Sequence, residues 1–161
     1  SDGADVPRAV LRELVALVLL GANALLLFVG LIDLFVPFSD SSTFTGRAGG
    51  SFFDPMATTG EVWAMCQVLH DWPDAECRAI LSRCRERMRE TDRLLVIEML
   101  TVPGEPNPGI AVLDMMMLLY FGEARQRTVA EYSELFRATG LEYSRVVSTS
   151  SAFSIVEARP V

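Results

Sequence analysis

The fold is decided by residues 68–98, which read VLHDWPDAECRAILSRCRERMRETDRLLVIE. A short apolar run rich in strand-forming residues, 61–69, leads into this stretch. Pro73 suits the first position of a helix, and acidic residues follow it where the helix dipole favours anions. The closing run RLLVIE, 93–98, is continuously apolar, which is typical of a strand buried on both faces. The stretch therefore predicts a strand–helix–strand unit of an α/β sheet.

The sequence downstream of this unit predicts two more helices and two more strands. Thr128 and Glu131 have the spacing of a capping box, and Gly140 ends the helix that this box begins. The predicted elements are, in chain order, a loop over residues 101–109, a helix over 110–120, a helix between 128 and 140, and strands over 141–149 and 152–158. We therefore expect an α/β sheet with helices on its faces and an antiparallel C-terminal hairpin.

The composition narrows the class of protein. The chain has 161 residues, of which 50% are hydrophobic, and a formal net charge of −7. This length fits one ordinary domain, and no large basic field is available for nucleic acid. The cysteines lack CxxC spacing and the chain has one histidine, so we expect reduced thiols and no metal site. We predict a cytoplasmic protein that does not bind nucleic acid.

The N-terminal region contains a long apolar segment. Residues 14–32, LVALVLLGANALLLFVGLI, carry no charge and approach the roughly 20 residues that span a bilayer. The alternative is a helix buried against its own domain and against a partner subunit, and the α/β pattern of the remaining chain favours this second interpretation. We therefore divide the chain into an apolar helical segment of dimerisation type, 1–38, and an α/β domain, 39–161, which begins with a Ser/Thr/Gly linker over 39–50.

His70 is the first candidate for chemistry. It stands between a predicted strand and a predicted helix, and ligands of open α/β sheets bind at the carboxyl ends of strands. A neutral imidazole there can take a proton from a substrate hydroxyl, and Glu98, at the end of the neighbouring strand, can orient it. The alternative is a structural histidine that caps the next helix or bonds a backbone carbonyl.

Four segments together resemble one family in order and spacing: GGSFFD (49–54), VLHDWPDAECRAILSRCRERM (68–88), RLLVIE (93–98) and VLDMMMLLYFGEARQRTVAEYSELFRATGL (112–141). They resemble the C-terminal half of the S-adenosylmethionine-dependent O-methyltransferases, the caffeate-type plant enzymes and their bacterial polyketide-tailoring relatives. The resemblance implies a partial Rossmann-like methyltransferase sheet. It also implies methyl transfer to a hydroxyl of an aromatic or polyketide small molecule.

The resemblance assigns roles to individual residues. His70 matches the family's catalytic base, and Glu98 matches one of two acidic residues that position it. Gln126 occupies the place of the second acid, where an amide can accept a hydrogen bond but cannot stabilise an imidazolium by charge. Met117 matches a methionine of the substrate pocket, and its alternative interpretation is ordinary helix core.

The resemblance also assigns half of a cofactor site. Ser51 and Phe52 match the strand-end pair beside the adenine of S-adenosylmethionine, although Phe52 is equally plausible as a core residue. The family's Gly-rich loop, which binds the methionine and ribose parts, has no matching string in these residues. Two functions therefore stay open: an O-methyltransferase, or a catalytically silent homologue that serves as a dimerisation or partner subunit.

The apolar N-terminal segment is similar to the family's dimerisation helix over residues 13–34. Apolar residues surround the predicted helix, so one contact with its own domain cannot cover every side. The prediction is a homodimer held through residues 14–36, with a second copy covering the remaining apolar surface.

Overall fold

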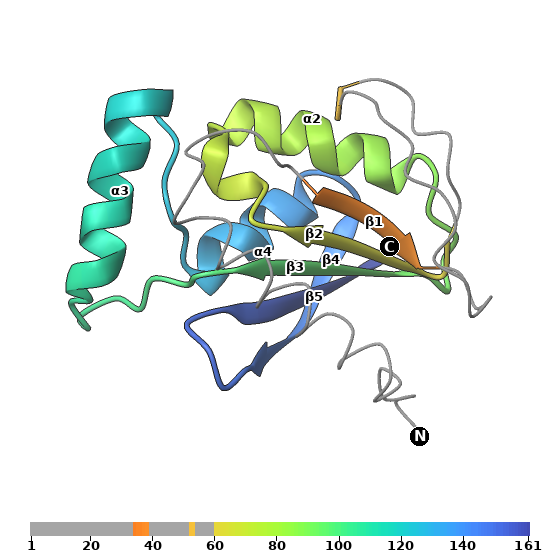
Figure 1. The fold of residues 1–161 in the computed structure, drawn as a ribbon. Helices are drawn as coiled ribbons and strands as arrows, with labels where there is room; N and C mark the ends of the chain where they lie inside the picture. The colour runs from red at the N-terminus through yellow and green to blue at the C-terminus, as the bar shows by residue number, and fades with distance from the viewer. Residues whose placement is uncertain (1–33, 39–51, 54–59) are drawn as a thin grey trace. The chain divides into compact units, whose positions relative to one another are not determined.

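The computed structural model describes residues 34–38, 52–53 and 60–161 (Figure 1). Its centre is a five-stranded sheet with the strand order β1-β2-β3-β5-β4. The strands are β1 (Leu34–Phe38), β2 (Val62–Cys66), β3 (Arg93–Glu98), β4 (Leu141–Ser148) and β5 (Ser154–Pro160). The helices are the 3₁₀ turn η1 (Leu69–Asp71), α2 (Asp74–Arg85), α3 (Pro108–Phe121) and α4 (Val129–Arg137).

The strand directions confirm the predicted α/β fold. β2 and β3 are parallel and are joined through α2, whereas β5 lies between β3 and β4 and is antiparallel to both. The C-terminal hairpin is therefore present. It joins the sheet through its second strand, because β5 and not β4 pairs with β3.

Strand β1 differs from the prediction. Residues 34–38 were expected to be the end of the N-terminal helical segment, but they form an edge strand antiparallel to β2. The local sequence LFVPF explains the difference, since Pro37 disfavours a helix interior and lacks the N–H that a central strand needs. An edge position accommodates this proline.

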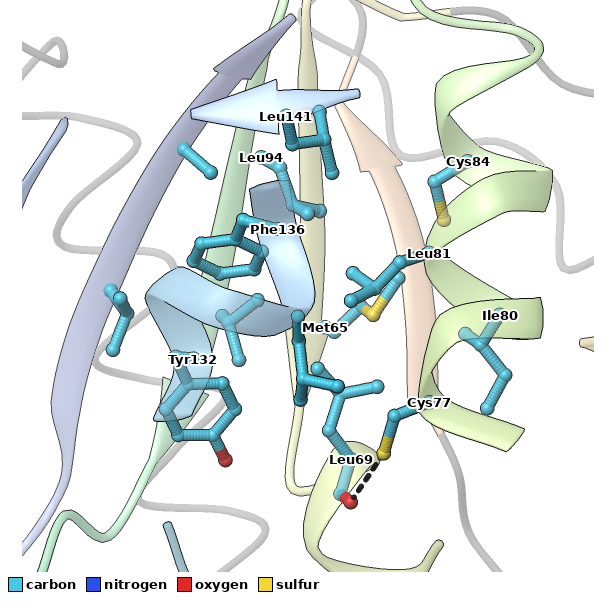
Figure 2. Packing of buried hydrophobic residues seen from close by; sticks show 14 of the residues in the cluster. Met65, Leu69, Cys77, Ile80, Leu81, Cys84, Leu94, Tyr132, Phe136 and Leu141 are labelled. Carbon is cyan, nitrogen blue, oxygen red and sulfur yellow. Dashed lines mark hydrogen bonds between the residues drawn. The ribbon is translucent and has the colours of Figure 1, made fainter. Parts of the chain in front are cut away.

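The main hydrophobic core lies on one face of the sheet, where both α2 and α4 pack (Figure 2). α2 packs on this core through one face, because its residues Cys77, Ile80, Leu81 and Cys84 are all fully buried. Strand side chains alternate between faces. Leu94 and Val96 of β3 therefore contribute to this core together with Tyr132 and Phe136 of α4, while Leu95 and Ile97 lie on the opposite face.

Element ends follow local capping chemistry. β3 has the predicted bounds, and the capping box of Thr128 and Glu131 starts α4 as expected. α3 begins two positions before the predicted residue 110, because the Asn107 side chain accepts hydrogen bonds from the amides of Gly109 and Ile110. β5 begins at Ser154 and not at 152, because a polar turn around Thr149 occupies the preceding residues.

Several predictions concern residues outside the described part of the chain. These are the helix over residues 1–33, the linker over 39–50, the role of Ser51 and most of the dimer segment 14–36. Within the described residues, no helix combines the length and apolarity that a membrane crossing requires.

Candidate active site

A short turn after β2 carries the histidine. β2 ends at Cys66, and Gln67 then takes a left-handed backbone conformation with φ of 55°. The Gln67 amide still donates to the Ile97 carbonyl of β3 at 3.0 Å, so the turn starts from a fixed sheet position. One turn of 3₁₀ helix follows, and His70 is its central residue. Left-handed non-glycine residues are uncommon and concentrate at functional sites.

Glu98 meets His70 at the edge of the sheet. It is the last residue of β3, and because β2 and β3 are parallel their carboxyl ends lie at the same edge. Glu98 Oε2 lies 2.8 Å from His70 Nδ1, and Oε1 accepts from the backbone amides of Val68 (3.1 Å) and Leu69 (3.0 Å). The expected convergence of His70 and Glu98 is confirmed. One buried carboxylate holds both the ring and the backbone of the turn.

Asp71 contacts the other ring nitrogen. Its Oδ1 lies 3.1 Å from His70 Nε2, so each nitrogen of the imidazole has a carboxylate partner. Burial opposes a charge on this ring, but Glu98 and Asp71 outweigh it and raise the pKa of His70 to about 10. The imidazole is therefore protonated at neutral pH in this arrangement, whereas the sequence suggested a neutral base. Sequence reasoning missed Asp71, although its adjacency to the histidine was a visible signal.

Arg127 binds the backbone carbonyls of the turn that carries His70. This fully buried guanidinium donates from Nη1 to the Leu69 carbonyl (2.7 Å) and from Nη2 to the Trp72 carbonyl (2.7 Å). Its Nε and Nη2 also donate to Asp74 Oδ1 at the start of α2, at 3.0 and 2.8 Å. Slight burial works against the Asp74 carboxylate, but Arg127 holds the pKa of Asp74 below its usual value. Sequence reasoning missed Arg127, whose only signal was its position beside the Thr128 cap.

Gln126 is not hydrogen-bonded to His70 among the contacts of the described residues. Its backbone amide donates to Asp114 Oδ1 of α3 at 2.7 Å, and its buried side-chain Oε1 accepts no hydrogen bond from the part of the chain that the structure describes. The structure thus places Gln126 as the residue that joins the loop before α4 to α3. Met117 is half-buried on α3, a helix that contacts η1.

An aromatic pair lies beside the same turn. Phe53 and Trp72 meet edge to face with ring centroids 5.1 Å apart, and Arg83 Nε donates to the Phe53 carbonyl at 3.2 Å. The indole Nε1 of Trp72 is buried and has no acceptor within residues 34–38, 52–53 and 60–161. Phe52 packs against the core cluster, which agrees with the second of its two sequence interpretations. Phe53 is the more exposed of the two phenylalanines.

The cysteines contribute packing rather than chemistry. Cys66, Cys77 and Cys84 are all free thiols. Burial raises the pKa of Cys66 to about 11 and the pKa of Cys77 to about 12, so neither thiol is a nucleophile at neutral pH. Within residues 34–38, 52–53 and 60–161, no group of three or more His, Cys, Asp or Glu side chains could hold a metal ion.

Known proteins match the chain over this site and its surrounding fold. The family model described as an O-methyltransferase domain matches residues 36–142. The chain is 40% identical over 116 residues to a phenazine O-methyltransferase, PhzM, of Lysobacter antibioticus, with 72% of this chain and 34% of that protein covered. It is 41% identical over 116 residues to the 2,7-dihydroxy-5-methyl-1-naphthoate 7-O-methyltransferase of Streptomyces carzinostaticus, covering 70% and 33%.

Solved structures agree with these relatives. The crystal structure of LaPhzM superposes with a TM-score of 0.69 at 40% identity, covering 72% of this chain and 35% of that one. An O-methyltransferase from neocarzinostatin biosynthesis, in complex with S-adenosyl-L-homocysteine and 1,4-dihydroxy-2-naphthoic acid, gives 0.61 at 37% identity, covering 70% and 33%. The chain spans about a third of the length of the relatives it matches. His70, Glu98 and the parallel strands β2 and β3 lie within residues 36–142, and the chain belongs to the O-methyltransferase domain family.

Proposed function

We propose that the chain carries the base-bearing half of an S-adenosylmethionine-dependent O-methyltransferase. The observation that supports this most directly is the buried pair of His70 and Glu98, 2.8 Å apart at the carboxyl ends of neighbouring parallel strands. Ligands of open α/β sheets bind at this edge. The acceptor we propose is a hydroxyl of an aromatic or polyketide small molecule, the class on which the phenazine and naphthoate relatives are named to act.

The proposed role of His70 follows from its two partners. Glu98 keeps Nδ1 occupied, so Nε2 is the nitrogen that faces an acceptor hydroxyl. Asp71 accepts from Nε2 in the structure, and a substrate hydroxyl must therefore replace the Asp71 carboxylate. In the reacting state His70 is neutral at Nε2. The hydroxyl proton passes to Nε2, and Glu98 stabilises the imidazolium that results. The acceptor oxygen is then free to take the methyl group that S-adenosylmethionine would supply, with S-adenosyl-L-homocysteine as the leaving product.

The residues of this chain suit one end of S-adenosylmethionine, the adenine. S-adenosylmethionine, when bound, supplies the methyl group. An adenine ring would lie against the exposed Phe53, which meets Trp72 edge to face. The indole N–H of Trp72 has no acceptor among the described residues. The family resemblance assigns Ser51 and Phe52 to this same end of the cofactor. The residues present do not include the Gly-rich string that would hold the methionine and ribose parts. We therefore derive no contact for those parts from this chain.

A second candidate is a catalytically silent partner subunit. The double carboxylate contact favours it, because an imidazolium bonded at both nitrogens cannot accept a proton. Gln126 occupies the place of the second acid of the family, and it makes no hydrogen bond to His70 among the described residues. Of the two family positions, Glu98 alone then holds the imidazole, which also favours the silent subunit. In this function, and in the first, we propose a homodimer through residues 14–36. The free thiols suit a cytoplasmic location.

Two measurements separate the candidates. Isothermal titration calorimetry of the chain with S-adenosyl-L-homocysteine tests whether the adenine half of the cofactor site binds. Methyl transfer to 1,4-dihydroxy-2-naphthoic acid is then compared between the natural chain and His70→Gln, which keeps an amide nitrogen near Glu98. An enzyme should lose about 10²–10⁴-fold of its rate in this variant. Heat of binding without turnover supports the silent subunit, and an unchanged rate in His70→Gln would exclude the base role.

A further inference from the structure

We propose that Arg127 is a positioning residue of this site: its guanidinium grips the backbone carbonyls on either side of His70 and so keeps the imidazole on Glu98. This inference rests on the proposed function for its catalytic meaning. The structural part of the inference, that Arg127 holds the turn in place, rests on contacts between described residues.

The two sides of the turn are held by different groups. On the N–H side, Glu98 Oε1 accepts from the amides of Val68 and Leu69. On the C=O side, Arg127 donates to the carbonyls of Leu69 and Trp72, both at 2.7 Å. His70 lies between these two carbonyls in the chain. A single 3₁₀ turn has few hydrogen bonds of its own, so these side chains determine where its backbone lies.

An arginine suits this task for a physical reason. Its planar fork presents several fixed donors, and two of them reach separate carbonyls while Nε and Nη2 reach Asp74. A lysine has one compact ammonium group and cannot span these acceptors. Cys77 Sγ also lies within hydrogen-bond distance of the Leu69 and Trp72 carbonyls, at 3.2 and 3.3 Å. A thiol has one S–H, which is a weak donor, so it cannot replace the guanidinium.

The contact pattern also argues against a role confined to the start of α2. Asp74 is 45% exposed at its side chain, so water can solvate this carboxylate without Arg127. The contact with the Leu69 carbonyl is buried, and the guanidinium itself is fully buried. Loss of Arg127 removes the 2.7 Å donors of both carbonyls. Among the described residues, the Leu69 carbonyl then keeps the Trp72 amide at 3.3 Å and the Cys77 thiol, and the Trp72 carbonyl keeps the thiol alone. We therefore expect the turn to shift to find stronger partners.

The test uses the one histidine of the chain as its own probe. NMR titration of the imidazole is recorded for the natural chain, Arg127→Lys and Arg127→Gln. Asp74→Asn is the matched control, since it breaks the ion pair but keeps both carbonyl contacts. Thr128→Ala is the stability control, since it breaks the adjacent helix cap without touching the turn. We expect the histidine pKa to fall by about one unit or more in both Arg127 variants and to move little in the controls.

The sign of the change decides the interpretation. Removing a nearby cation by itself would raise the histidine pKa, so a rise in Arg127→Gln means that Arg127 acts by charge, and the proposal is then wrong. An equal shift in Asp74→Asn assigns the effect to the ion pair and overturns it too. Loss of the folded state in both Arg127 variants, monitored by circular dichroism, would show a general structural role instead. None of these readouts needs turnover, so failure of methyl transfer and failure of this inference are distinguishable.

Discussion

At the scale of single residues, Glu157 shows how much one buried charge can depend on its neighbours. It is fully buried on β5, on the sheet face opposite the main core. Three guanidinium groups surround its carboxylate: Arg93 at 3.3 Å, Arg145 at 2.8 Å and Arg159 at 3.6 Å. Together these positive charges offset the free-energy cost of burying the carboxylate. The sequence offered no hint of this cluster, because its members come from three different strands.

Replacing this carboxylate should destabilise the fold. We predict that Glu157→Ala lowers the free energy of unfolding by about 2 kcal/mol, because partly buried Arg93 loses its counterion. Arg159→Ala is the control, and it should cost less than about 0.5 kcal/mol because Arg159 is half-exposed. Urea unfolding monitored by tryptophan fluorescence measures both. Equal losses in the two variants would contradict this account.

His70 should make stability depend on pH. Its folded-state pKa of about 10 lies above the ordinary value of 6.5. Below pH 6.5 the folded and unfolded chains both hold the proton, so the stabilisation is fully present. As the pH rises from 6.5 toward 10, the unfolded chain releases the proton first, and stability falls by up to about 1.4 kcal/mol per pH unit.

The chain is well suited to this measurement. Its 14 basic residues are all arginine, so no lysine titrates in this range. Urea unfolding at pH 6.5 and pH 8 should show the loss in the natural chain and not in His70→Gln. A slope that survives in His70→Gln would mean that another group is responsible.

At the scale of elements, the sequence was most informative where local chemistry acts alone. β3 and the Thr128 capping box were predicted correctly, because a continuous apolar run and an i, i+3 pair are complete within one segment. β1 was missed, because its strand conformation depends on pairing with β2, whose residues are 24 (Phe38 with Val62) to 32 (Leu34 with Cys66) positions away along the chain. The His70–Glu98 contact could be predicted, because the two residues follow neighbouring parallel strands. The contact of Arg127 with the His70 turn could not, because it depends on tertiary packing.

The start of α3 gives an element-scale prediction. Asn107 caps this helix by accepting from the amides of Gly109 and Ile110. Asn107→Ala should therefore lower the free energy of unfolding by about 1 kcal/mol, whereas Asn107→Gly should cost only a few tenths. Chemical denaturation of the two variants tests this. If they lose equal stability, the side-chain cap is not what starts the helix.

At the scale of the whole molecule, α3 presents an unusual amount of apolar surface. Val112, Met115, Leu118 and Leu119 are between 53% and 73% exposed. Monomers rarely expose contiguous apolar patches of this kind. We predict that the double variant Leu118→Gln, Leu119→Gln reduces the concentration-dependent association of the chain. Sedimentation velocity over a concentration series measures it, and an unaltered distribution would show that this helix takes no part in association.

The enclosure of His70 between two carboxylates has a consequence for its reactivity toward added reagents. A ring nitrogen attacks an electrophile through an unshared electron pair, and here both nitrogens carry protons directed at Glu98 and Asp71. Diethyl pyrocarbonate, which acylates neutral imidazole, should therefore leave the folded chain unmodified at neutral pH and react readily once the chain is unfolded. Because the chain has one histidine, the rate of acylation directly reports the fraction of molecules in which this turn has opened.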